Sequence, residues 1–416
     1  MPTIVIVGAG IGGLSLALAL ARRGIASSVL EQAEQLEQTG AGIQLSPNAT
    51  RILLDLGLGD LLRASAVTPE AVRVVSAKGR EILRVPLGSV AEERYGAPYY
   101  VLHRADLQSA LLAASQTMPE ITLRLGVRVQ DYAVTPSGIT LRCRTGGEMI
   151  EVQASSLVGA DGLWSSVRAQ IDPAAPRFAQ RSAWRALIPA QQAPAEFRAP
   201  LVHLWLGRDA HLVHYPVSAG AMINIVAIVN DCWKQEGWTA IGQPDALLAR
   251  LRPANWHASA RALLGVPDHW QKWTLYDHAP LQGPLSGPVT LLGDAAHPVL
   301  PFLAQGAALA IEDAWILAEA IAASPDDLAS AMRVFEAHRY ARTCRVQRAA
   351  RANGAIYHLS GLAGFGRDKV MRLLGGARLL SRYDWLYGWK PSTPGGQTNP
   401  AAPPSRTRAK RSGAVH

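Results

Sequence analysis

The apolar positions of the first residues are spaced as a short strand, a helix and a second strand. Residues 3–7 (TIVIV) are all β-branched, which favours a buried strand. Residues 14–24 (LSLALALARRG) are dominated by Leu and Ala, which are strong helix formers, and the closing Arg-Arg-Gly is typical of a helix end. Residues 27–31 (SSVLE) then predict a second strand. The N-terminus is therefore predicted to form a strand–helix–strand unit.

Two later apolar runs end in turns. Residues 157–168 (LVGADGLWSSVR) pass from a predicted strand into Asp-Gly and a pair of serines that favours a helix start. Residues 289–292 predict another strand, and residues from 306 onward repeat Ala, Leu and Ile at helical spacing. The loop between these last two elements is mostly apolar and contains two prolines, although loops are usually polar. It therefore predicts a wall against which something packs, and the free N–H groups of the following helix favour an anion or an electron-rich oxygen.

The middle of the chain has a different pattern. Residues 178–280 contain short strand-like runs separated by Gly, Pro, Asp and Asn, among them WRALIPA, LVHLWLG, HLVHYPV and MINIVAIV. These runs predict an antiparallel sheet inserted between the parts described above. Residues 326–355 predict a basic helical arm, and residues 369–389 predict a final helical cover.

Composition narrows the class of protein. The chain has 416 residues, enough for two or three domains, and 49% of them are hydrophobic. No uninterrupted apolar run reaches the roughly 18 residues that span a bilayer, and the N-terminus lacks the basic region of a secretory signal. Three cysteines, Cys143, Cys232 and Cys344, lie far apart without metal-ligand spacing. We therefore expect a cytoplasmic protein without a metal site and without a membrane partner.

The positive charge is concentrated at the C-terminal end. The formal net charge is +9, but five Lys and Arg residues and no acid lie from residue 390 onward, which leaves +4 for the rest. This end is rich in Pro, Gly, Ser and Thr and has no apolar face, so residues 391–416 are predicted to be disordered. The charge distribution therefore does not predict a nucleic-acid partner.

The first turn carries a dinucleotide-binding motif. Gly8, Gly10 and Gly13 complete G-x-G-x-x-G between a strand and a helix, the context in which this motif is informative. Gly8 permits the tight turn, Gly10 lets the backbone approach a pyrophosphate, and Gly13 lets the helix pack on the strand. Glu31, 23 residues after Gly8, is placed to accept hydrogen bonds from ribose hydroxyls. The alternative is an ordinary turn with a surface Glu, and the motif alone does not choose between FAD and NAD.

The order of three turns along the chain indicates FAD as the cofactor. GAGIGG, ADG and GDAAHP follow one another along the chain, and with them it closely resembles the single-component, class A FAD-dependent aromatic hydroxylases, the class that includes salicylate and hydroxybenzoate monooxygenases. The resemblance runs from about residue 3 to 355. It implies an α/β fold with a Rossmann-like FAD-binding domain, an inserted antiparallel β-sheet substrate domain and C-terminal helices. The implied boundaries are 1–75, 100–177 and 281–325 for the FAD-binding domain, 76–99 and 178–280 for the substrate domain, and 326–390 for the helical region.

The resemblance also implies how the apolar loop serves FAD. Asp294 would hydrogen-bond the ribityl chain, and the loop through His297, Pro298 and Pro301 would line the isoalloxazine ring. The helix that begins at Gly306 and Ala307 would point its N–H groups at the N1 and O2 edge, where reduced flavin is negative. The alternatives are that Asp294 caps a helix or turn and that the prolines fix a turn.

Further cofactor contacts are implied at three other positions. Arg104 matches the family arginine near the FAD phosphate and ribityl chain, although it could be a surface helix residue. Val129 lies where the family gives backbone contacts to adenine, and Asp161 belongs to a motif that serves both FAD and the nicotinamide cofactor. Since no second G-x-G-x-x-G follows, NADH or NADPH is expected to bind transiently, and the choice between them stays open.

The run HLVHYPV supplies the predicted catalytic residues. In an alternating strand His211 and Tyr215 face the same side, so they could share a ligand wall. A free phenol has a pKa of about 10, and histidine, with a pKa of about 6.5, is a suitable base for it, so His211 is the first choice. Tyr215 would orient a substrate hydroxyl or carboxylate, and His214 is the alternative base if the register shifts by one residue. The competing interpretation is that these side chains are satisfied within a sheet.

Three more residues are candidates for substrate contacts. Gln44 occupies a place near the flavin where some relatives carry a His. Trp184 and Arg185 begin the predicted sheet and could stack on, or pair with, an aromatic acid, although a structural Trp is an equal alternative.

These observations predict an FAD-dependent monooxygenase. It would use NAD(P)H and O₂ to hydroxylate a small aromatic compound, such as a hydroxylated aromatic or heteroaromatic carboxylic acid, through a flavin C4a-hydroperoxide. The alternatives are a hydroxylase of a larger quinone precursor or polycyclic natural product and, from a different class, a noncatalytic binding module on an FAD-type fold. A homodimer is left open.

Overall fold

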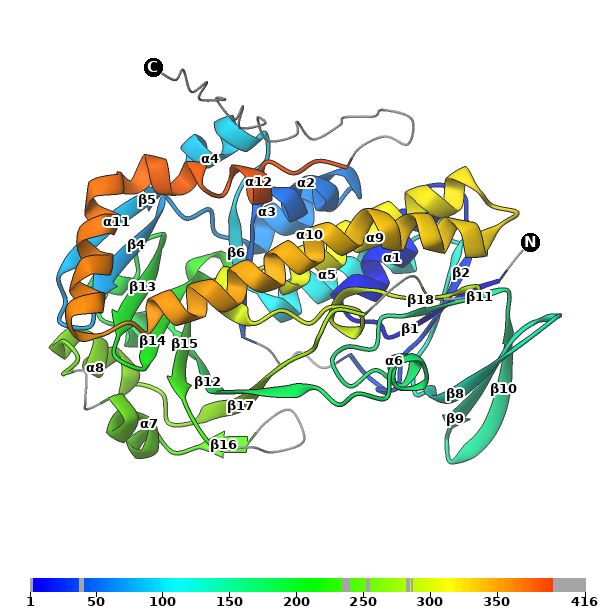
Figure 1. Cartoon of the computed structure of the whole chain (residues 1–416), viewed down its shortest axis with the longest axis horizontal. Coiled ribbons are helices and arrows are strands. Elements are labelled where there is room, and N and C mark those ends of the chain that lie inside the picture. Colours follow the sequence, from blue (N-terminus) through cyan, green and yellow to red (C-terminus); the bar gives the residue numbers. More distant parts are fainter. Residues whose placement is uncertain are drawn as a thin grey trace, which may run out of the picture.

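A five-stranded parallel sheet organises the N-terminal part of the fold (Figure 1). The computed structural model describes residues 3–36, 41–233, 240–251, 255–281, 285 and 287–391, so the predicted disordered tail lies outside the described residues except for residue 391. The strand order is β18-β11-β1-β2-β7, and every neighbouring pair is parallel. The strands are β1 Ile4–Val7, β2 Ser27–Leu30, β7 Ile121–Arg124, β11 Ser156–Gly159 and β18 Val289–Leu291.

The three predicted motif strands are neighbours in this sheet. Val7 pairs with Gly159, and Gly159 pairs with Leu291, so β1, β11 and β18 end at the same edge. The turns GAGIGG, ADG and GDAAHP therefore start side by side. A crevice at the carboxyl ends of parallel strands is the usual ligand site of such sheets.

Two helices that are mostly apolar in sequence cover the sheet. In α1 (Ile11–Ala21) every residue except Gly12 is buried, and α9 (Gly306–Ala323) packs against it in the same core. Close packing depends on glycine here, since a Cβ at Gly13 would lie 1.9 Å from the carbonyl oxygen of Gly8. The third helix of this layer is α5 (Arg104–Gln116).

An eight-stranded sheet forms the other large layer. Its order is β16-β17-β12-β15-β14-β13-β4-β5, and all neighbours are antiparallel except β13 and β4. Since β4 begins at Ala71, part of the stretch 1–75 that was expected in the FAD-binding domain contributes to this sheet. The strands are β4 Ala71–Ser76, β5 Glu81–Pro86, β12 Arg177–Pro189, β13 Leu201–Gly207, β14 Ala210–Val217, β15 Met222–Asn230, β16 Ala240–Gly242 and β17 Trp270–Asp277.

Smaller elements complete the two layers. One face of the large sheet shares a core with α7 (Pro244–Leu251) and α8 (Ala258–Leu264). A three-stranded antiparallel sheet and a two-stranded pair lie beside the parallel sheet and the cavity, respectively. These strands and the remaining short helices are β8 Arg128–Thr135, β9 Gly138–Thr145, β10 Glu148–Ala154, β3 Gly42–Leu45, β6 Tyr100–His103, α2 Pro47–Asp55, α3 Gly59–Ser65, α4 Gly88–Tyr95 and α6 Ser166–Ile171.

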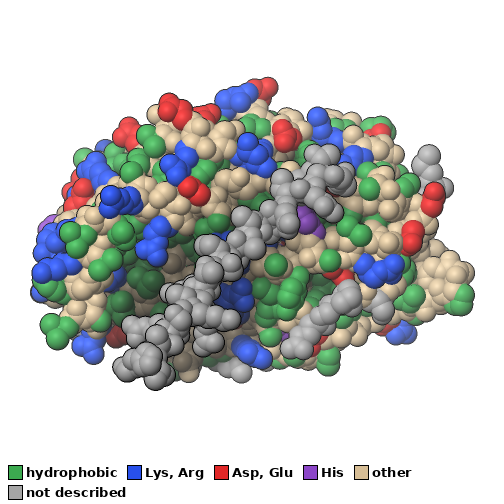
Figure 2. Space-filling model, turned by 45° about the horizontal axis from the view of Figure 1, so that its top comes forward, with side chains coloured by type: hydrophobic (Ala, Val, Ile, Leu, Met, Phe, Trp, Pro, Cys, Tyr) green, Lys and Arg blue, Asp and Glu red, His purple; other side chains and the backbone are tan. Residues whose placement is uncertain are grey.

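The C-terminal region is helical, as predicted. Helix α10 (Leu328–Tyr357) runs from beside α9 to the ends of β14 and β15, and α11 (Gly361–Ser381) lies against β5 (Figure 1). A short helix, α12 (Asp384–Tyr387), follows. Among the helices of the described residues, none is both long and apolar enough to cross a membrane. Positive and negative side chains are interspersed over the face shown in Figure 2.

Candidate active site

A cavity of about 290 Å³ lies between the parallel-sheet edge and the large sheet. One side is formed by the turns after β1, β11 and β18 and by the start of α9, and the other by β12, β14 and β15. The predicted site residues that line it are Gly10, Gln44, Arg104, Arg185, His211, Tyr215, Asp294, Pro301, Gly306 and Ala307. The predicted cofactor and substrate residues thus meet in one cavity.

The glycine turn is shaped for close approach by a ligand. Gly8 has φ +105°, and a Cβ there would lie 2.5 Å from the carbonyl oxygen of Ala160. This conformation favours glycine and excludes a larger side chain. A Cβ at Gly10, in contrast, would meet nothing within 4 Å, so the backbone is open to the cavity at the position where a pyrophosphate would approach.

Glu31 lies against the glycine turn rather than in the lining of the cavity. Its carboxylate accepts hydrogen bonds from the backbone N–H of Ala9 at 2.8 Å and of Ala33 at 2.9 Å. An ionised carboxylate has about four acceptor positions, so two bonds leave capacity for ribose hydroxyls. The structure thus gives Glu31 a role in holding the turn in addition to the predicted one.

Asp161 caps a helix. Its carboxylate accepts hydrogen bonds from the backbone N–H of Ser166 at 2.7 Å and from the hydroxyl of Ser165 at the start of α6. The side chain is therefore turned to the helix, while the next residue, Gly162, lines the cavity. The serine pair in the sequence was the signal for this cap.

Val129 and Pro298 are not cavity residues. Val129 pairs with Cys143 in the three-stranded sheet, and its side chain is buried in the core beside the parallel sheet. Pro298 is buried, and its carbonyl accepts a hydrogen bond from Gln347 of α10 at 2.9 Å. Pro298 therefore does not face the cavity as predicted. The contact predicted for Val129 is made by its backbone, so the direction of its side chain does not test it, and it stays a prediction.

The electrostatics of the cavity suit FAD. The N-termini of α1 and α9 open on it, and neither first turn contains an acid. Arg104 and Arg185 add positive charge, and Asp294 is the only acidic residue that lines the cavity within the described part of the chain. Two helix dipoles and two guanidinium groups favour a pyrophosphate and an electron-rich flavin edge.

Asp294 lies beside the N-terminus of α9. A Cβ at Gly306 would be 3.8 Å from its Oδ1 atom, an ordinary contact distance that places the carboxylate next to the start of the helix. Burial raises the pKa of Asp294 above its ordinary value, while Arg104 and His297 oppose the rise. The surrounding protein desolvates this carboxylate, but the residue is exposed to the open cavity that it lines. It is therefore an accessible acceptor for the ribityl hydroxyls of a bound flavin.

Replacing Asp294 by Ala is expected to weaken FAD binding by ~10- to 100-fold, because a hydrogen bond to a charged group contributes about 1.5–3 kcal/mol. FAD retention after dialysis, measured by flavin absorbance and by fluorescence titration, tests this. Asp294→Asn keeps an acceptor of the same shape and should lose less. Full flavin occupancy in the Ala variant would show that Asp294 does not hold FAD.

Strand register decides which side chains of the large sheet face the cavity. Val226 pairs with both Arg185 and Val213, so β12, β15 and β14 contribute adjacent side chains to one wall. His211 and Tyr215 lie two positions before and after Val213 on the same face. All five residues line the cavity, and the predicted alternation of HLVHYPV agrees with this arrangement.

The opposite face carries His214 and Trp184. His214 is fully buried; its ring is stacked on His203 at 4.4 Å between centroids, and its Nε2 accepts from Trp205 at 3.0 Å. Trp184 belongs to the core under α7 and α8, and its indole N–H donates to Ser182. The structure therefore places the alternative base and the predicted stacking residue away from the cavity.

His211 is paired with a second histidine. Its Nδ1 is 2.9 Å from the Nε2 atom of His358, and its ring packs near Phe302 and Tyr357. Burial lowers the pKa of His211 well below 6.5, and His358 and Arg181 lower it further, so the imidazole is neutral at physiological pH. A neutral imidazole at a cavity is a hydrogen-bond acceptor and a base.

Tyr215 and Gln44 form the other end of the wall. Burial raises the pKa of Tyr215 above its ordinary value, against Arg185 and a hydrogen bond from Gln44, so its hydroxyl remains a donor. Gln44 accepts a hydrogen bond from the Tyr99 hydroxyl at 2.8 Å, a contact that sequence reasoning missed. Asn224 was also missed; it accepts from the backbone N–H of Gly42 at 2.7 Å and joins the two-stranded pair to the sheet.

Arg185 is a half-buried cation without an acidic partner. Its guanidinium lies 4.4 Å above the Trp273 ring, and within the described residues no carboxylate pairs with it. Burial lowers the pKa of Arg185 to about 10; Arg104 adds to the drop and Tyr215 opposes it. The group is still charged at neutral pH, so an anion in the cavity would satisfy it.

A buried ion network supports the cofactor side of the cavity from behind. Asp313 of α9 accepts from the backbone N–H of Gly293 at 3.0 Å and from His297 at 2.6 Å, and it also pairs with Arg339 of α10 at 2.6 Å. Arg339 bonds Glu312 as well, at 2.7 Å. His297, which sequence analysis placed beside the flavin, is thus turned to Asp313.

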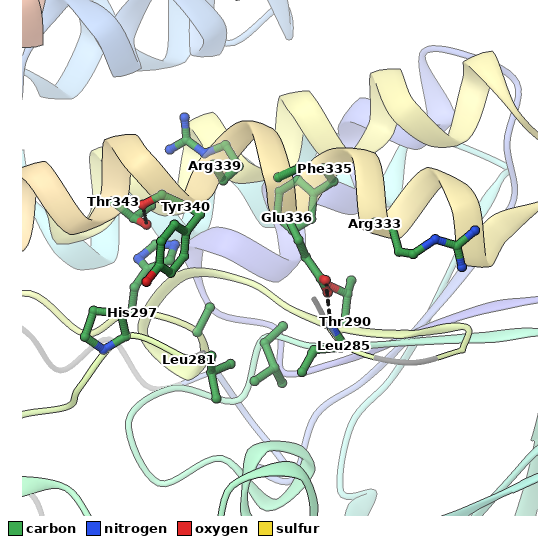
Figure 3. A pocket seen from close by; sticks show the side chains of 14 residues that line it. Leu281, Leu285, Thr290, His297, Arg333, Phe335, Glu336, Arg339, Tyr340 and Thr343 are labelled. Carbon is green, nitrogen blue, oxygen red and sulfur yellow. Dashed lines mark hydrogen bonds between the residues drawn. The ribbon is translucent and has the colours of Figure 1, made fainter. Parts of the chain in front are cut away.

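A second cavity of about 640 Å³ lies behind this loop, between α10 and the chain around Leu281 (Figure 3). His297, Arg339 and Tyr340 line it together with apolar side chains, and Glu336 reaches across to Thr290. It is the larger of the two, but of the residues predicted to contact substrate or cofactor only His297 lines it within the described part of the chain. The cavity with His211 and Asp294 is therefore the candidate active site.

Comparisons with known proteins agree with the geometry. A family model described as an FAD binding domain matches residues 1–352. The chain is 37% identical over 392 residues to 3-amino-4-hydroxybenzoate 2-monooxygenase of Streptomyces platensis, covering 94% of this chain and 96% of that one. It is also 37% identical over 388 residues to 3-hydroxybenzoate 6-hydroxylase 1 of Aquipseudomonas alcaligenes, covering 92% and 97%.

Solved structures show the same fold. A salicylate hydroxylase in a substrate complex has a TM-score of 0.77 at 26% identity and covers 94% of this chain and 96% of its own. HpxO of Klebsiella pneumoniae, complexed with FAD and uric acid, has a TM-score of 0.80 at 24% identity and covers 93% and 96%. The predicted α/β fold class is thereby confirmed.

Proposed function

Since this chain belongs to the FAD-binding family of class A aromatic hydroxylases, we propose that its substrate is a benzoate-type acid with a ring hydroxyl group. The chain is an FAD-dependent monooxygenase that uses NAD(P)H and O₂ to hydroxylate an aromatic compound. The predictions of an enzyme and of FAD as its cofactor are confirmed, and the alternative of a noncatalytic binding module is wrong.

The residues that would hold FAD are those that open on the cavity. The glycine turn and the start of α1 would bind the pyrophosphate, Asp294 the ribityl chain, and the start of α9 the electron-rich edge of the ring. When bound, FAD accepts a hydride from NAD(P)H and activates O₂ for transfer to the substrate. The sheet wall opposite excludes water from the reacting ring, since its valine and isoleucine side chains face the cavity.

His211 and Tyr215 act on the substrate hydroxyl in this proposal. A ring attacked by an electrophilic oxygen reacts faster when it is electron-rich, and loss of the phenol proton supplies that electron density. His211 is neutral and faces the cavity, so it takes the proton, while the Tyr215 hydroxyl orients the ring oxygen by a hydrogen bond.

The guanidinium of Arg185 is the main support for a carboxylic acid as the substrate. A half-buried guanidinium group at a cavity, without an acidic partner among the described residues, favours a carboxylate, with which it forms two parallel hydrogen bonds. It lies two strands away from His211 across β15, a separation of roughly 10 Å at about 4.8 Å per strand, which the long Arg side chain shortens. A phenolic acid therefore spans the two groups better than an uncharged polycyclic compound does.

The relatives suggest which carbon is hydroxylated. The name of one specifies position 2 of a benzoate, and the name of the other specifies position 6. Both positions neighbour the carbon that bears the carboxylate. We extend this to the present chain: Arg185 holds the carboxylate so that an adjacent ring carbon faces the flavin. Product analysis with 3-hydroxybenzoate tests the position, and hydroxylation remote from the carboxylate would contradict it.

Replacing Arg185 by Gln is expected to raise KM for a hydroxybenzoate by ~10- to 100-fold, because a charge-assisted hydrogen bond contributes about 1.5–3 kcal/mol. The KM for phenol, which has no carboxylate, should change little. Arg177→Gln, at the exposed start of the same strand, is the matched control. An equal rise in KM for both compounds would show that Arg185 does not bind the substrate carboxylate.

The rival substrate class is tested in the same assay. Benzoates with one ring hydroxyl should accelerate NAD(P)H oxidation and be recovered as hydroxylated products. If only a quinone precursor or polycyclic phenol is hydroxylated, the small-acid proposal fails.

The proposal also includes the division into domains, a cytoplasmic location and a homodimer. Limited proteolysis tests the domain boundaries, cell fractionation tests the location, and light scattering tests the oligomeric state.

A further inference from the structure

A second histidine stands directly behind the proposed base. His358 follows α10 as its C-cap, is 8% exposed, and places Nε2 at 2.9 Å from the Nδ1 atom of His211. The two residues are 147 positions apart in the chain, and α10 brings them together at the ends of β14 and β15. His358 lies beyond residue 352, where the family match ends.

The partners of Asn230 determine which atom of His358 carries the proton. The Asn230 amide nitrogen donates to Asp209 at 3.1 Å, and Arg181 Nε donates to the Asn230 oxygen at 3.3 Å. These two contacts orient the amide, so the oxygen that lies 3.1 Å from His358 Nδ1 is an acceptor. His358 must therefore carry its proton on Nδ1, and its Nε2 atom is an acceptor.

The position of the proton on His358 also determines the tautomer of His211. Because His358 Nε2 is an acceptor, His211 Nδ1–H is the donor in the bond between them. His211 is neutral, so its Nε2 atom has a free lone pair, and no described residue hydrogen-bonds that atom. His211 lines the cavity, so this lone pair is the one available to a substrate hydroxyl.

We propose that His358 is a positioning residue that fixes the tautomer of His211, so that His211 presents Nε2 to the substrate as a proton acceptor. The proposal rests on the proposed function in one respect, namely that the group that gives its proton to His211 is the phenolic hydroxyl of the substrate. When the substrate proton moves from its phenolic oxygen to His211 Nε2, the positive charge on His211 is stabilised by the Nδ1–H bond to His358. No proton leaves His358 in this step.

The surroundings keep His358 in place and neutral. Arg367 of α11 donates to the carbonyls of Ile356, Tyr357 and Leu359, which holds the end of α10 around His358. Burial lowers the pKa of His358 to about 3, and Arg181 and Arg367 contribute. The titratable or charged groups that face the pair are thus Arg181 from β12, Tyr357 from α10 and Arg367 from α11.

Nuclear magnetic resonance of the FAD-loaded protein with ¹⁵N-labelled histidine tests the tautomers without any substrate. Both His211 and His358 should carry the proton on Nδ1 and show an unprotonated Nε2, with signals assigned by single substitutions. Protonation of His211 at Nε2 would overturn the proposal. This result does not depend on which aromatic compound is hydroxylated. It therefore separates failure of the proposed role of His358 from failure of the proposed function.

Kinetics of two His358 variants test the consequence. His358→Leu removes the acceptor and should lower kcat for a hydroxybenzoate by ~10- to 100-fold with KM nearly unchanged, the range expected for loss of a hydrogen bond to a charged group. The pH at which the bound phenol ionises, followed by its ultraviolet absorbance, should rise. His358→Gln keeps an acceptor and should recover part of both effects. A Gln variant as impaired as the Leu variant would contradict the proposal.

A double-mutant cycle with His211→Phe distinguishes positioning from a structural role. If His358 acts through His211, replacing it in the His211→Phe protein should lower kcat no further. An additional loss in that background would show that His358 acts independently and would overturn the inference. Flavin content and thermal unfolding temperature are measured for each variant, and the comparison uses kcat per bound flavin.

Discussion

His211→Phe is expected to retain FAD and to lose hydroxylation turnover by roughly 10²- to 10⁴-fold, the usual contribution of a positioned general base. The ring keeps its place among Phe302, Tyr357 and His358, so the wall of the cavity remains packed. What disappears is the nitrogen lone pair that faces the substrate. Product formation by chromatography and flavin content by absorbance measure the two properties separately.

His214 provides the matched control for this substitution. It lies three residues away on the same strand, but its ring is stacked on His203 on the opposite face. His214→Asn keeps a polar group near Trp205 and should leave turnover per bound flavin close to that of the wild type, even if stability falls. If His214→Asn abolished hydroxylation while His211→Phe did not, the register of the wall and the choice of base would both be wrong.

Arg339→Met is expected to lower the free energy of unfolding by up to about 3–5 kcal/mol, because it removes a cation shared by two buried carboxylates. Glu312 keeps Arg342, and Asp313 keeps its hydrogen bond with His297. Arg339 is 3% exposed and bonds Asp313 at 2.6 Å and Glu312 at 2.7 Å. Arg348→Met, an exposed position on the same helix, should change stability by less than about 0.5 kcal/mol. Urea unfolding followed by fluorescence measures both variants, and similar values for the two would contradict a structural role for the network.

The effect of Arg339→Met should depend on pH in a defined direction. Although burial opposes it, His297 and Arg339 hold the pKa of Asp313 below its ordinary value, and Arg339 and Arg342 do the same for Glu312. Groups with lowered pKa values stabilise the fold above their unfolded values of about 4 and lose that contribution as the pH falls through the folded values. The difference between wild type and variant should therefore be full at neutral pH and shrink below about pH 4.

Local patterns in the sequence were sufficient for the parts of the site that are close together in the chain. Strand alternation placed His211 and Tyr215 on one face, because a period of two is a property of the backbone alone. The three turns are far apart in the chain, and only the resemblance to the hydroxylase family predicted that they meet; parallel pairing of β1, β11 and β18 brings them to one edge. The same reasoning could not choose between Trp184 and Arg185, since only pairing with β15 tells which face looks into the cavity.

Contacts made by distant segments were beyond prediction from the sequence. His358 stands at the end of a helix whose direction is decided by packing, and IYHLS contains no pattern that indicates a partner on β14. The resemblance placed Pro298 at the cofactor, but chain position does not determine where a side chain points, and Pro298 is buried away from the cavity. Asp161 had a local signal in its two serines, and it caps the helix accordingly.

Helix α10 contacts both the network behind the loop of Asp294 and the proposed base. Arg339 bonds the residues behind the loop of Asp294, and His358, 19 positions later, contacts the base, a span of roughly 28 Å at about 1.5 Å per residue. The helix is continuous over these positions, so a shift along its axis displaces both contacts together. The same helix therefore supports the cavity at two points, at the loop that carries Asp294 and at the histidine proposed as the base, and fixes the spacing between them.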